Sequence, residues 1–201
     1  MRIVALGDST TAGTPNFLSP LEHPPDGKGD VTSQYAHWLM HHHPEWEVLN
    51  RGVNGQRTDE IRARFERDVT QNHPHAVVIL AGVNDVYLHL PLRQIQENLL
   101  AMYQRARELG IIVVGGTVIP YNTAKLEENR ELHRLNQWIL DQQIPVCDFH
   151  KAVQDVRDHD YLRQSPDGLH PTPTGYHRMA VALRPVLEDA LGVPPAPGHN
   201  R

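Results

Sequence analysis

The stretch His75-Ala76-Val77-Val78-Ile79-Leu80-Ala81 indicates the fold class of this 201-residue chain. It is a continuous apolar run rich in β-branched residues, whereas a strand with one face in water alternates apolar and polar residues. A strand of this kind belongs inside a parallel sheet that is covered on both faces. Ile111-Ile112-Val113-Val114 repeats the pattern further along. The two runs therefore predict an α/β protein.

Three more short apolar runs complete the expected sheet. We expect strands at Arg2–Leu6, Trp46–Leu49, His75–Ala81, Ile111–Thr117 and Pro145–Phe149. Between them apolar residues recur at helical spacing, in the stripes Ile61/Phe65/Val69, Leu92/Ile95/Leu99/Met102/Ala106, Leu132/Leu135/Ile139 and Tyr176/Met179/Ala180/Leu183/Val186/Leu187. Alternating strands and helices with short connections predict a three-layer α/β/α sandwich, and five parallel strands suit the order 2-1-3-4-5.

The chain is predicted to be a single domain over residues 1–191, because its length suits one core and no linker divides it. Thr14–Val31 holds four of the 16 prolines and predicts a long loop. Gly192–Arg201 predicts a flexible C-terminal tail.

Charge and composition exclude several classes of protein. Lys and Arg number 19 against 24 Asp and Glu, for a net charge of -5, and no basic run suits nucleic acid or an anionic membrane. No stretch approaches the roughly 20 apolar residues of a membrane span. The apolar run Arg2–Leu6 is too short to be the apolar region of a signal peptide. We expect a cytoplasmic protein and, if it assembles, a homo-oligomer.

Polar segments follow the predicted strands, at the edge where open parallel sheets bind their ligands. Gly7-Asp8-Ser9-Thr10 follows the first strand, Asn50–Gly55 the second and Gly82-Val83-Asn84-Asp85 the third. Asp167-Gly168-Leu169-His170 precedes the last helix. We expect the four segments to converge on one site.

These segments hold the parts of a serine hydrolase. Ser9 lies at a strand-to-helix turn, but a serine hydroxyl needs a base to act as a nucleophile. His170 is the candidate base, and Asp167 can accept a hydrogen bond from its other ring nitrogen and fix the tautomer. The N–H groups of Ser9 and Gly55 and the Asn84 amide are candidate donors to an oxyanion.

In this order the four segments resemble the sequence blocks of the SGNH/GDSL hydrolases. They match the nucleophile block, the second block with its terminal glycine, the G-x-N-D block and the D-x-x-H block. The resemblance runs from Gly7 to His170 and so covers most of the chain. It implies a flavodoxin-like α/β/α fold and a serine esterase that hydrolyses esters or related acyl bonds through an acyl-serine, without a cofactor. We expect small carboxylic esters, because nothing in the chain suggests a lipid-binding surface, and we expect no metal.

The resemblance also implies a role for each residue. Ser9 is the nucleophile, His170 the base and Asp167 its orienting acid, and the oxyanion hole consists of Ser9, Gly55 and Asn84.

Two positions depart from the family pattern. Thr10 stands where leucine is usual, and Gln56-Arg57 stand where an acidic residue and threonine are frequent. The second departure leaves open whether Gly52 or Gly55 donates to the oxyanion.

Several alternatives remain at this point. Within the family, the substrate is alternatively an acetylated carbohydrate, a thioester or a lysophospholipid, and Thr14–Val31 and Val86-Tyr87-Leu88 are expected to line the acyl pocket. Outside it, a flavodoxin-like module would bind phosphate or flavin at the Ser9 turn. A metal-dependent phosphoesterase would use Asp8, Asn84, Asp85 and His170 as ligands.

Histidine is abundant, with 14 residues. His41-His42-His43 suggests a metal site, but consecutive helical residues point in different directions, so we expect surface residues. The lone cysteine, Cys147, is expected to be a buried small hydrophobe.

Overall fold

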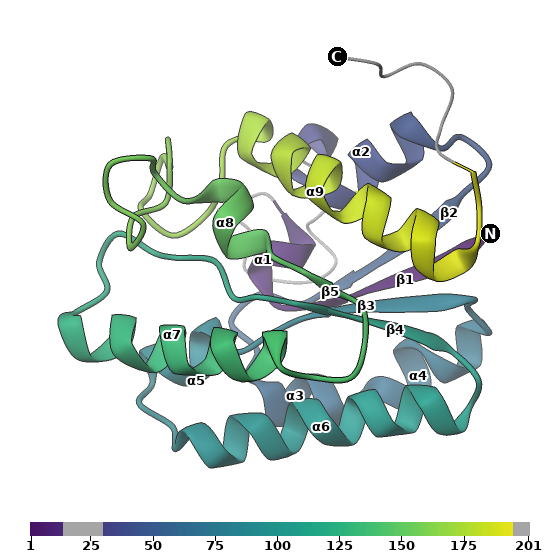
Figure 1. The fold of residues 1–201 in the computed structure, drawn as a ribbon, viewed down its shortest axis with the longest axis horizontal. Helices are drawn as coiled ribbons and strands as arrows, with labels where there is room; N and C mark the ends of the chain where they lie inside the picture. The colour runs from purple at the N-terminus through teal and green to yellow at the C-terminus, as the bar shows by residue number, and fades with distance from the viewer. Residues whose placement is uncertain (14–29, 195–201) are drawn as a thin grey trace.

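The computed structural model describes residues 1–13 and 30–194, which form a three-layer α/β/α sandwich (Figure 1). The five-stranded sheet has the order β2-β1-β3-β4-β5, with every neighbouring pair parallel. Its strands are β1 (Arg2–Gly7), β2 (Glu47–Gly52), β3 (Ala76–Leu80), β4 (Ile112–Gly116) and β5 (Val146–Cys147). The predicted fold class and strand order are confirmed.

The central strands explain the continuous apolar runs. Every residue of β3 is buried, and successive side chains of a strand point to opposite faces of the sheet. Val77 and Ile79 join the core on one face, whereas Ala76 and Val78 join the core on the other. Both faces of β3 therefore lie in an apolar core, which explains why its residues are apolar without alternation.

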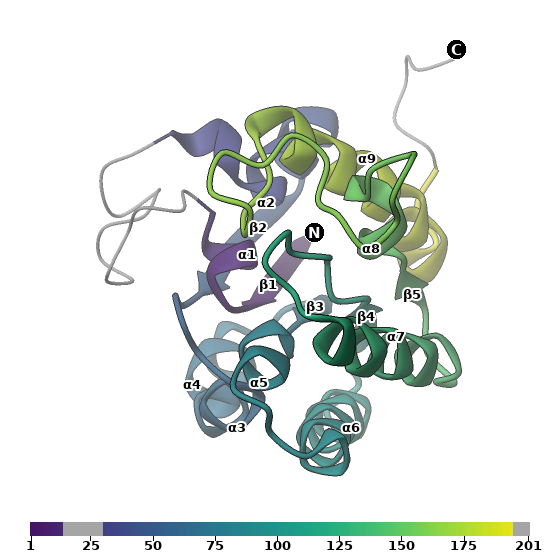
Figure 2. The same cartoon turned by 90° about the vertical axis from the view of Figure 1, so that its left-hand side faces the viewer.

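One face is covered by α2 (Tyr35–His42), α8 (Phe149–Val153) and α9 (Pro173–Leu191), with the short α1 (Ser9–Ala12) at its edge (Figures 1 and 2). The 3₁₀ helix η2 (Val31–Ser33) precedes α2. The buried side chains of this layer include Tyr35, Leu39, Phe149, Tyr176, Met179 and Leu183.

The opposite face carries α3 (Thr58–Ala63), α4 (Phe65–Asp68), α5 (Val83–Tyr87), α6 (Leu92–Glu108) and α7 (Leu126–Leu140), with the 3₁₀ helix η3 (Thr70–Asn72) after α4. Its core includes Ile61, Phe65, Ile95, Leu99, Leu132 and Leu135. The predicted stripes thus lie on the faces that pack against the sheet.

Several element boundaries differ from the prediction, among them the end of β2 at Gly52 rather than Leu49, and two of the differences have a side-chain cause. The stripe Ile61/Phe65/Val69 predicts one helix, but the chain breaks between α3 and α4 at Arg64, whose side chain turns inward to backbone carbonyls. The fifth strand ends at Cys147 rather than Phe149. Asp148 accepts a hydrogen bond from the Lys151 N–H and caps α8, so Phe149 is already helical.

Most of the predicted loop Thr14–Val31 and of the tail Gly192–Arg201 lies outside the described residues. In the described parts, Val31 begins η2 and Gly192 ends α9 with a positive φ of 63°. The single domain over 1–191 stays a prediction. Among the described residues, no helix combines the length and the apolarity needed to cross a membrane.

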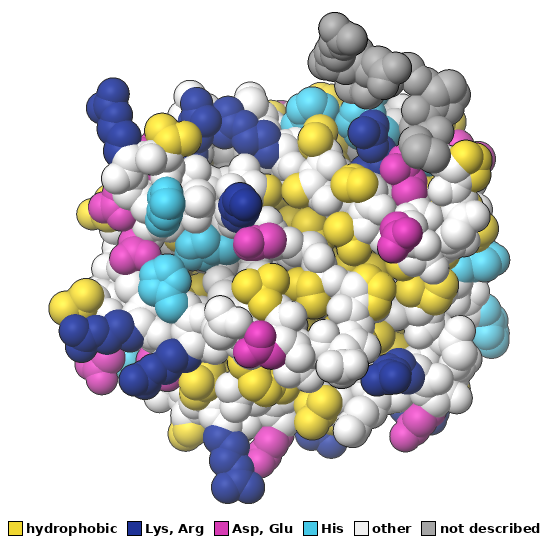
Figure 3. Space-filling model, viewed as in Figure 1, with side chains coloured by type: hydrophobic (Ala, Val, Ile, Leu, Met, Phe, Trp, Pro, Cys, Tyr) yellow, Lys and Arg dark blue, Asp and Glu magenta, His cyan; other side chains and the backbone are white. Residues whose placement is uncertain are grey.

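The histidines lie on separate parts of the face seen in Figure 3. The surface prediction is wrong for His43, which is 3% exposed and stacks on Trp46 at 3.9 Å between ring centroids. Its ring nitrogens lie 2.7 Å from Glu45 and 2.8 Å from Glu188, so it joins α2 to α9. Cys147 is buried as predicted, and burial raises the pKa of its thiol to about 12.

Candidate active site

The carboxyl ends of β1, β2 and β3 lie side by side, because Gly7 pairs with Gly52 on one side and with Leu80 on the other. The polar segments that follow these strands therefore start at one edge of the sheet. Figure 2 shows α1, α5 and the loop before α9 at this edge. The convergence expected from the sequence is present.

Ser9 is the first residue of α1. Asp8 caps this helix by accepting a 2.9 Å hydrogen bond from the Thr10 N–H. Asp8 is 1% exposed, and burial raises the pKa of its carboxyl to about 7. The cap holds the turn, and Ser9 itself stays partly exposed at the edge of the sheet.

Ser9, His170 and Asp167 form a chain of hydrogen bonds. The Ser9 Oγ lies 2.9 Å from His170 Nε2, although the two residues are 161 positions apart. His170 Nδ1 lies 2.8 Å from Asp167 Oδ2. This is the order of contacts found in a Ser-His-Asp triad.

The Asp167 carboxylate also orders its own loop. Its Oδ1 accepts hydrogen bonds from the N–H groups of Leu169 at 2.9 Å and His170 at 2.8 Å. Partial burial opposes ionisation, but the hydrogen bonds from the His170 ring and these N–H groups prevail and lower the pKa of Asp167 to about 2. The Asp167 carboxylate is therefore charged at neutral pH.

The two candidate glycines of the second segment differ in what surrounds them. The Gly52 N–H donates to Asn50 Oδ1 at 2.9 Å, and a Cβ at Gly52 would lie 2.0 Å from the Ala12 nitrogen. Gly52 thus allows β2 to approach α1. Gly55 is exposed, has a φ of +74° and has nothing within 4 Å of a Cβ position. The Gly52 N–H thus already has an acceptor, whereas Gly55 lies on an open turn.

Asn84 lies in the first turn of α5, and its Nδ2 donates to the Gln56 carbonyl at 2.9 Å. The next residue, Asp85, is buried and accepts from the Thr58 N–H at 2.9 Å and the Thr58 hydroxyl at 2.6 Å. Asn84 and Asp85 together fasten α5 to the segment that contains Gly55.

Arg64 holds the segments beneath the site together and was not among the predicted site residues. It is 7% exposed, and its guanidinium donates to the Gly7 carbonyl at 2.8 Å, the Arg51 carbonyl at 2.8 Å and the Gln56 Oε1 at 2.6 Å. Asp68 balances its charge at 2.7 Å. The available signal is its position three residues after Ile61, on the apolar side of the predicted helix.

A cavity of about 210 Å³ opens over Ser9 and His170. It is lined by Ser9, Thr10, Val83, Asn84, Tyr87, Tyr121, Leu169 and His170. Of the expected lining residues Val86-Tyr87-Leu88, only Tyr87 faces this cavity. Tyr121 and Leu169 were not predicted to line it.

The two carboxylates of the metal-site alternative are committed to other contacts. Asp8 accepts from Thr10, and Asp85 accepts from Thr58. Within residues 1–13 and 30–194, no group of three or more His, Cys, Asp or Glu side chains is arranged to hold a metal ion.

Two curated proteins match parts of this chain. The lipoprotein YqeF of Bacillus subtilis (strain 168), described as uncharacterized, is 26% identical over 113 residues, which are 46% of each chain. An acetylxylan esterase of Geobacillus stearothermophilus is 35% identical over 51 residues, 25% of this chain and 23% of that protein. The chain thus matches less than half the length of either relative.

Solved structures share the fold over nearly the whole chain. A G-D-S-L family protein from Desulfitobacterium hafniense DCB-2 has a TM-score of 0.76 at 24% identity, covering 92% of this chain and 99% of that chain. The lipase/acylhydrolase of Enterococcus faecalis has a TM-score of 0.74 at 23% identity, covering 98% and 99%. A catalytic mutant of the acetylxylan esterase Axe2 from Geobacillus stearothermophilus has a TM-score of 0.71 at 20% identity, covering 98% and 97%.

Family membership comes from the sequence itself. Residues 5–178 match the GDSL-like lipase/acylhydrolase family. This range includes all four polar segments, from Gly7 to His170. The chain belongs to the GDSL-like lipase/acylhydrolase family.

Proposed function

We propose that this protein is a serine esterase that hydrolyses small carboxylic esters through an acyl-serine intermediate. The observation that carries the proposal is the contact chain from Ser9 Oγ through His170 to Asp167, at 2.9 and 2.8 Å. Family membership and the acetylxylan esterases among its relatives support the same chemistry. A phosphate- or flavin-binding module would give this contact chain no role.

In the first step His170 Nε2 takes the proton of the Ser9 hydroxyl while the Ser9 oxygen bonds to the ester carbonyl carbon. The carbonyl oxygen becomes an oxyanion. The protonated His170 then gives its proton to the leaving alcohol as the C–O bond breaks, which leaves acyl-Ser9. Asp167 accepts from Nδ1–H throughout and stabilises the positive ring. Water then attacks the acyl carbon while His170 takes its proton. His170 returns a proton to the Ser9 oxygen as the acyl bond breaks, and the carboxylic acid leaves.

The proposed oxyanion donors come from three strand ends. The Ser9 N–H lies in the first turn of α1, where N–H groups lack intrahelical acceptors. The Gly55 N–H lies on an exposed turn. The Asn84 amide has two hydrogens, so one can hold the Gln56 carbonyl while the other points to the oxyanion.

A carbohydrate deacetylase is the second candidate within the family. It is favoured by the acetylxylan esterases among the matches and by a cavity of about 210 Å³, which is small against the roughly 300–1,000 Å³ typical of ligand pockets. Thioesterase and lysophospholipase activities remain further alternatives. The cytoplasmic location and a homo-oligomeric state stay predictions from the sequence, and one relative is named a lipoprotein.

Hydrolysis of 4-nitrophenyl acetate tests the proposal. We expect turnover by the wild type, and loss of nearly all of it in Ser9→Ala and His170→Ala with unchanged circular dichroism. Ser33→Ala is the matched control, because Ser33 is buried in η2 and does not line the cavity. An alkyl fluorophosphonate should add one phosphonyl group to wild type and none to Ser9→Ala. Wild-type turnover in Ser9→Ala would refute the mechanism.

A panel of 4-nitrophenyl acetate, acetylated xylose and an acyl thioester then separates the alternatives by relative kcat/KM.

A further inference from the structure

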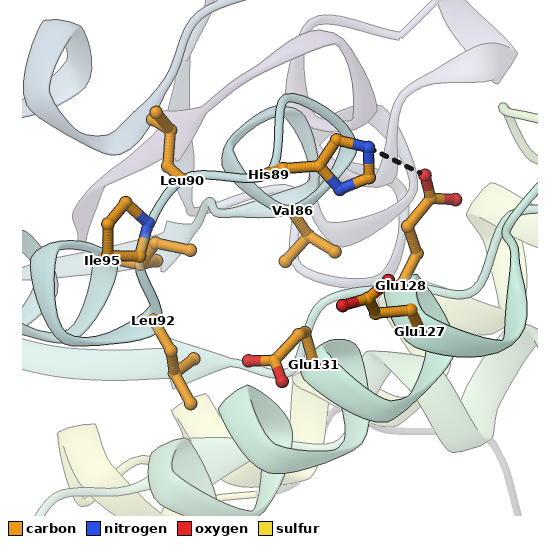
Figure 4. A pocket seen from close by; sticks show the side chains of 9 residues that line it. Val86, His89, Leu90, Leu92, Ile95, Glu127, Glu128 and Glu131 are labelled. Carbon is orange, nitrogen blue, oxygen red and sulfur yellow. Dashed lines mark ion pairs between the residues drawn. The ribbon is translucent and has the colours of Figure 1, made fainter.

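A second cavity, of about 220 Å³, lies on the other side of α5 from the active-site cavity. Figure 4 shows its apolar side, with Val86, Leu92 and Ile95, and its acidic side, with Glu127, Glu128 and Glu131. Helix α5 borders both spaces, since Val83 and Tyr87 line the active-site cavity and Val86 lines the second one. The two cavities are therefore neighbours that share a wall.

Tyr121 and Glu128 link the two cavities beside α5. The Tyr121 side chain lines the active-site cavity, and its hydroxyl donates to Glu128 Oε2 at 3.1 Å. Glu128 lines the second cavity. Tyr121 is 1% exposed and Glu128 is 5% exposed, so both belong to the interior. A direct hydrogen bond thus connects a residue of one cavity to a residue of the other.

This wall is held in place from both sides. Glu128 Oε2 also accepts from the Lys125 N–H at 2.7 Å, at the start of α7, and Glu128 Oε1 lies 3.5 Å from His89. On the other side, the residue after Tyr121 donates its N–H to the Gly168 carbonyl at 2.7 Å. The Tyr121 ring meets the ring of Tyr87 edge-on, with 6.3 Å between centroids. The ring therefore has a fixed position beside the triad.

We propose that Tyr121 determines acyl-chain specificity: its ring limits the length of the acyl chain that the active-site cavity accepts, and the second cavity is the space that a longer chain enters when the ring is removed. This inference rests on the proposed esterase function. It names short-chain acyl esters as the substrate class and one side chain as the cause.

The sizes of the two cavities support this assignment. The second cavity is similar in volume to the first, so a chain that reached it in the absence of the ring would gain additional room. Each additional methylene that leaves water for an apolar wall is worth about fourfold in binding. Val86, Leu92 and Ile95 supply such a wall on one side of the second cavity, opposite its acidic side. Removing the Tyr121 ring should therefore raise kcat/KM for medium-length acyl chains, by a factor that grows with chain length.

The test compares 4-nitrophenyl esters of two, four, six, eight and ten carbons. For the wild type we expect kcat/KM to fall at least tenfold from butyrate to octanoate. In Tyr121→Ala the octanoate-to-butyrate ratio should rise at least tenfold. Tyr121→Phe is the matched control: it keeps the ring and removes only the hydrogen bond to Glu128, so its ratio should stay within about twofold of wild type.

The outcomes separate this inference from the function on which it rests. Absence of Ser9-dependent hydrolysis of every ester would overturn the esterase function itself. Ser9-dependent hydrolysis with equal wild-type rates on butyrate and octanoate would overturn the role of Tyr121 alone, without any variant. An unchanged ratio in Tyr121→Ala would do the same. Tyr121→Leu, which keeps an apolar side chain in the core, replaces the alanine variant if that variant fails to fold.

Discussion

The guanidinium of Arg64 donates a 2.8 Å hydrogen bond to the carbonyl of Gly7, 57 residues earlier in the chain. Gly7 ends the strand that leads into Ser9. The same guanidinium donates to the Gln56 side chain, whose backbone follows Gly55 and accepts from Asn84. One buried cation thus connects the nucleophile turn to the segment that carries the proposed oxyanion donors.

Shortening Gln56 should weaken catalysis more than binding. In Gln56→Ala the Arg64 Nε loses its acceptor, and small displacements of catalytic groups cost up to roughly 100-fold in rate. We expect kcat to fall on the order of tenfold with KM changed less than twofold. Gln56→Glu keeps an acceptor for Arg64 and should restore most of kcat. A rise in KM with unchanged kcat, or no recovery of kcat in Gln56→Glu, would contradict a positioning role.

Removing the Asn84 amide should slow the chemical step. By comparison with the loss of other oxyanion donors, Asn84→Ala should lower kcat by about 10²–10³. Asn84→Asp places an anion beside the developing charge and should be at least as slow. Steady-state kinetics on 4-nitrophenyl acetate, with melting curves as the control for folding, measures the effect. An alanine variant with more than half of wild-type kcat would exclude Asn84 from the oxyanion hole.

Asp167→Asn should leave the loop in place but present the wrong tautomer of His170 to Ser9. The expected loss in kcat is on the order of 10⁴, as for the equivalent change in other serine triads. Since the pKa of Asp167 is about 2, its charge is constant from pH 4 upward. Asp167 should therefore contribute nothing to the acid limb of the wild-type rate profile, which should follow a single protonation. A limb that requires two protonations would contradict this assignment.

Asp8 should make the protein less stable as the pH rises. Burial raises its pKa from 3.8 to about 7 in the folded state, so between these values the folded chain holds a proton that the unfolded chain releases. The contribution of Asp8 to the free energy of unfolding is greatest below pH 4 and falls by up to about 4 kcal/mol by pH 7. Asp8→Asn retains an acceptor for the Thr10 N–H and removes the titration.

Urea unfolding at pH 4, 5.5, 7 and 8 measures this effect. The difference in the free energy of unfolding between Asp8→Asn and wild type should grow in favour of the variant up to pH 7 and then level off. A difference that is constant across this range would show that Asp8 titrates alike in both states.

Layer order and the polar strand ends were predictable because they depend on local patterns. An uninterrupted apolar run such as Val77-Val78-Ile79 predicts a strand buried on both faces. The pair Asp167 and His170 was predictable because the two residues are only three positions apart. Arg64 acts through a contact with Gly7, 57 residues earlier, and its place on the apolar side of the predicted helix does not specify that partner. Tyr121 contacts Glu128 only seven residues later, but it belongs to no periodic stripe that would mark it. Tyr121 nevertheless follows the fourth strand, so examining every strand end would have placed it among the candidates.

The base and its orienting acid lie in residues 154–172, a fully described stretch between α8 and α9 whose only strand-like pairing is one isolated bridge, Gln154 to Leu162. Ser9 instead follows a central, buried strand. The two halves of the triad therefore belong to regions with different free energies of local opening. We expect activity to disappear at lower urea than the helical circular dichroism signal, with amide exchange at Leu169 faster than at Val78. Loss of function in this protein would then be a reversible detachment of the histidine from a sheet that remains folded.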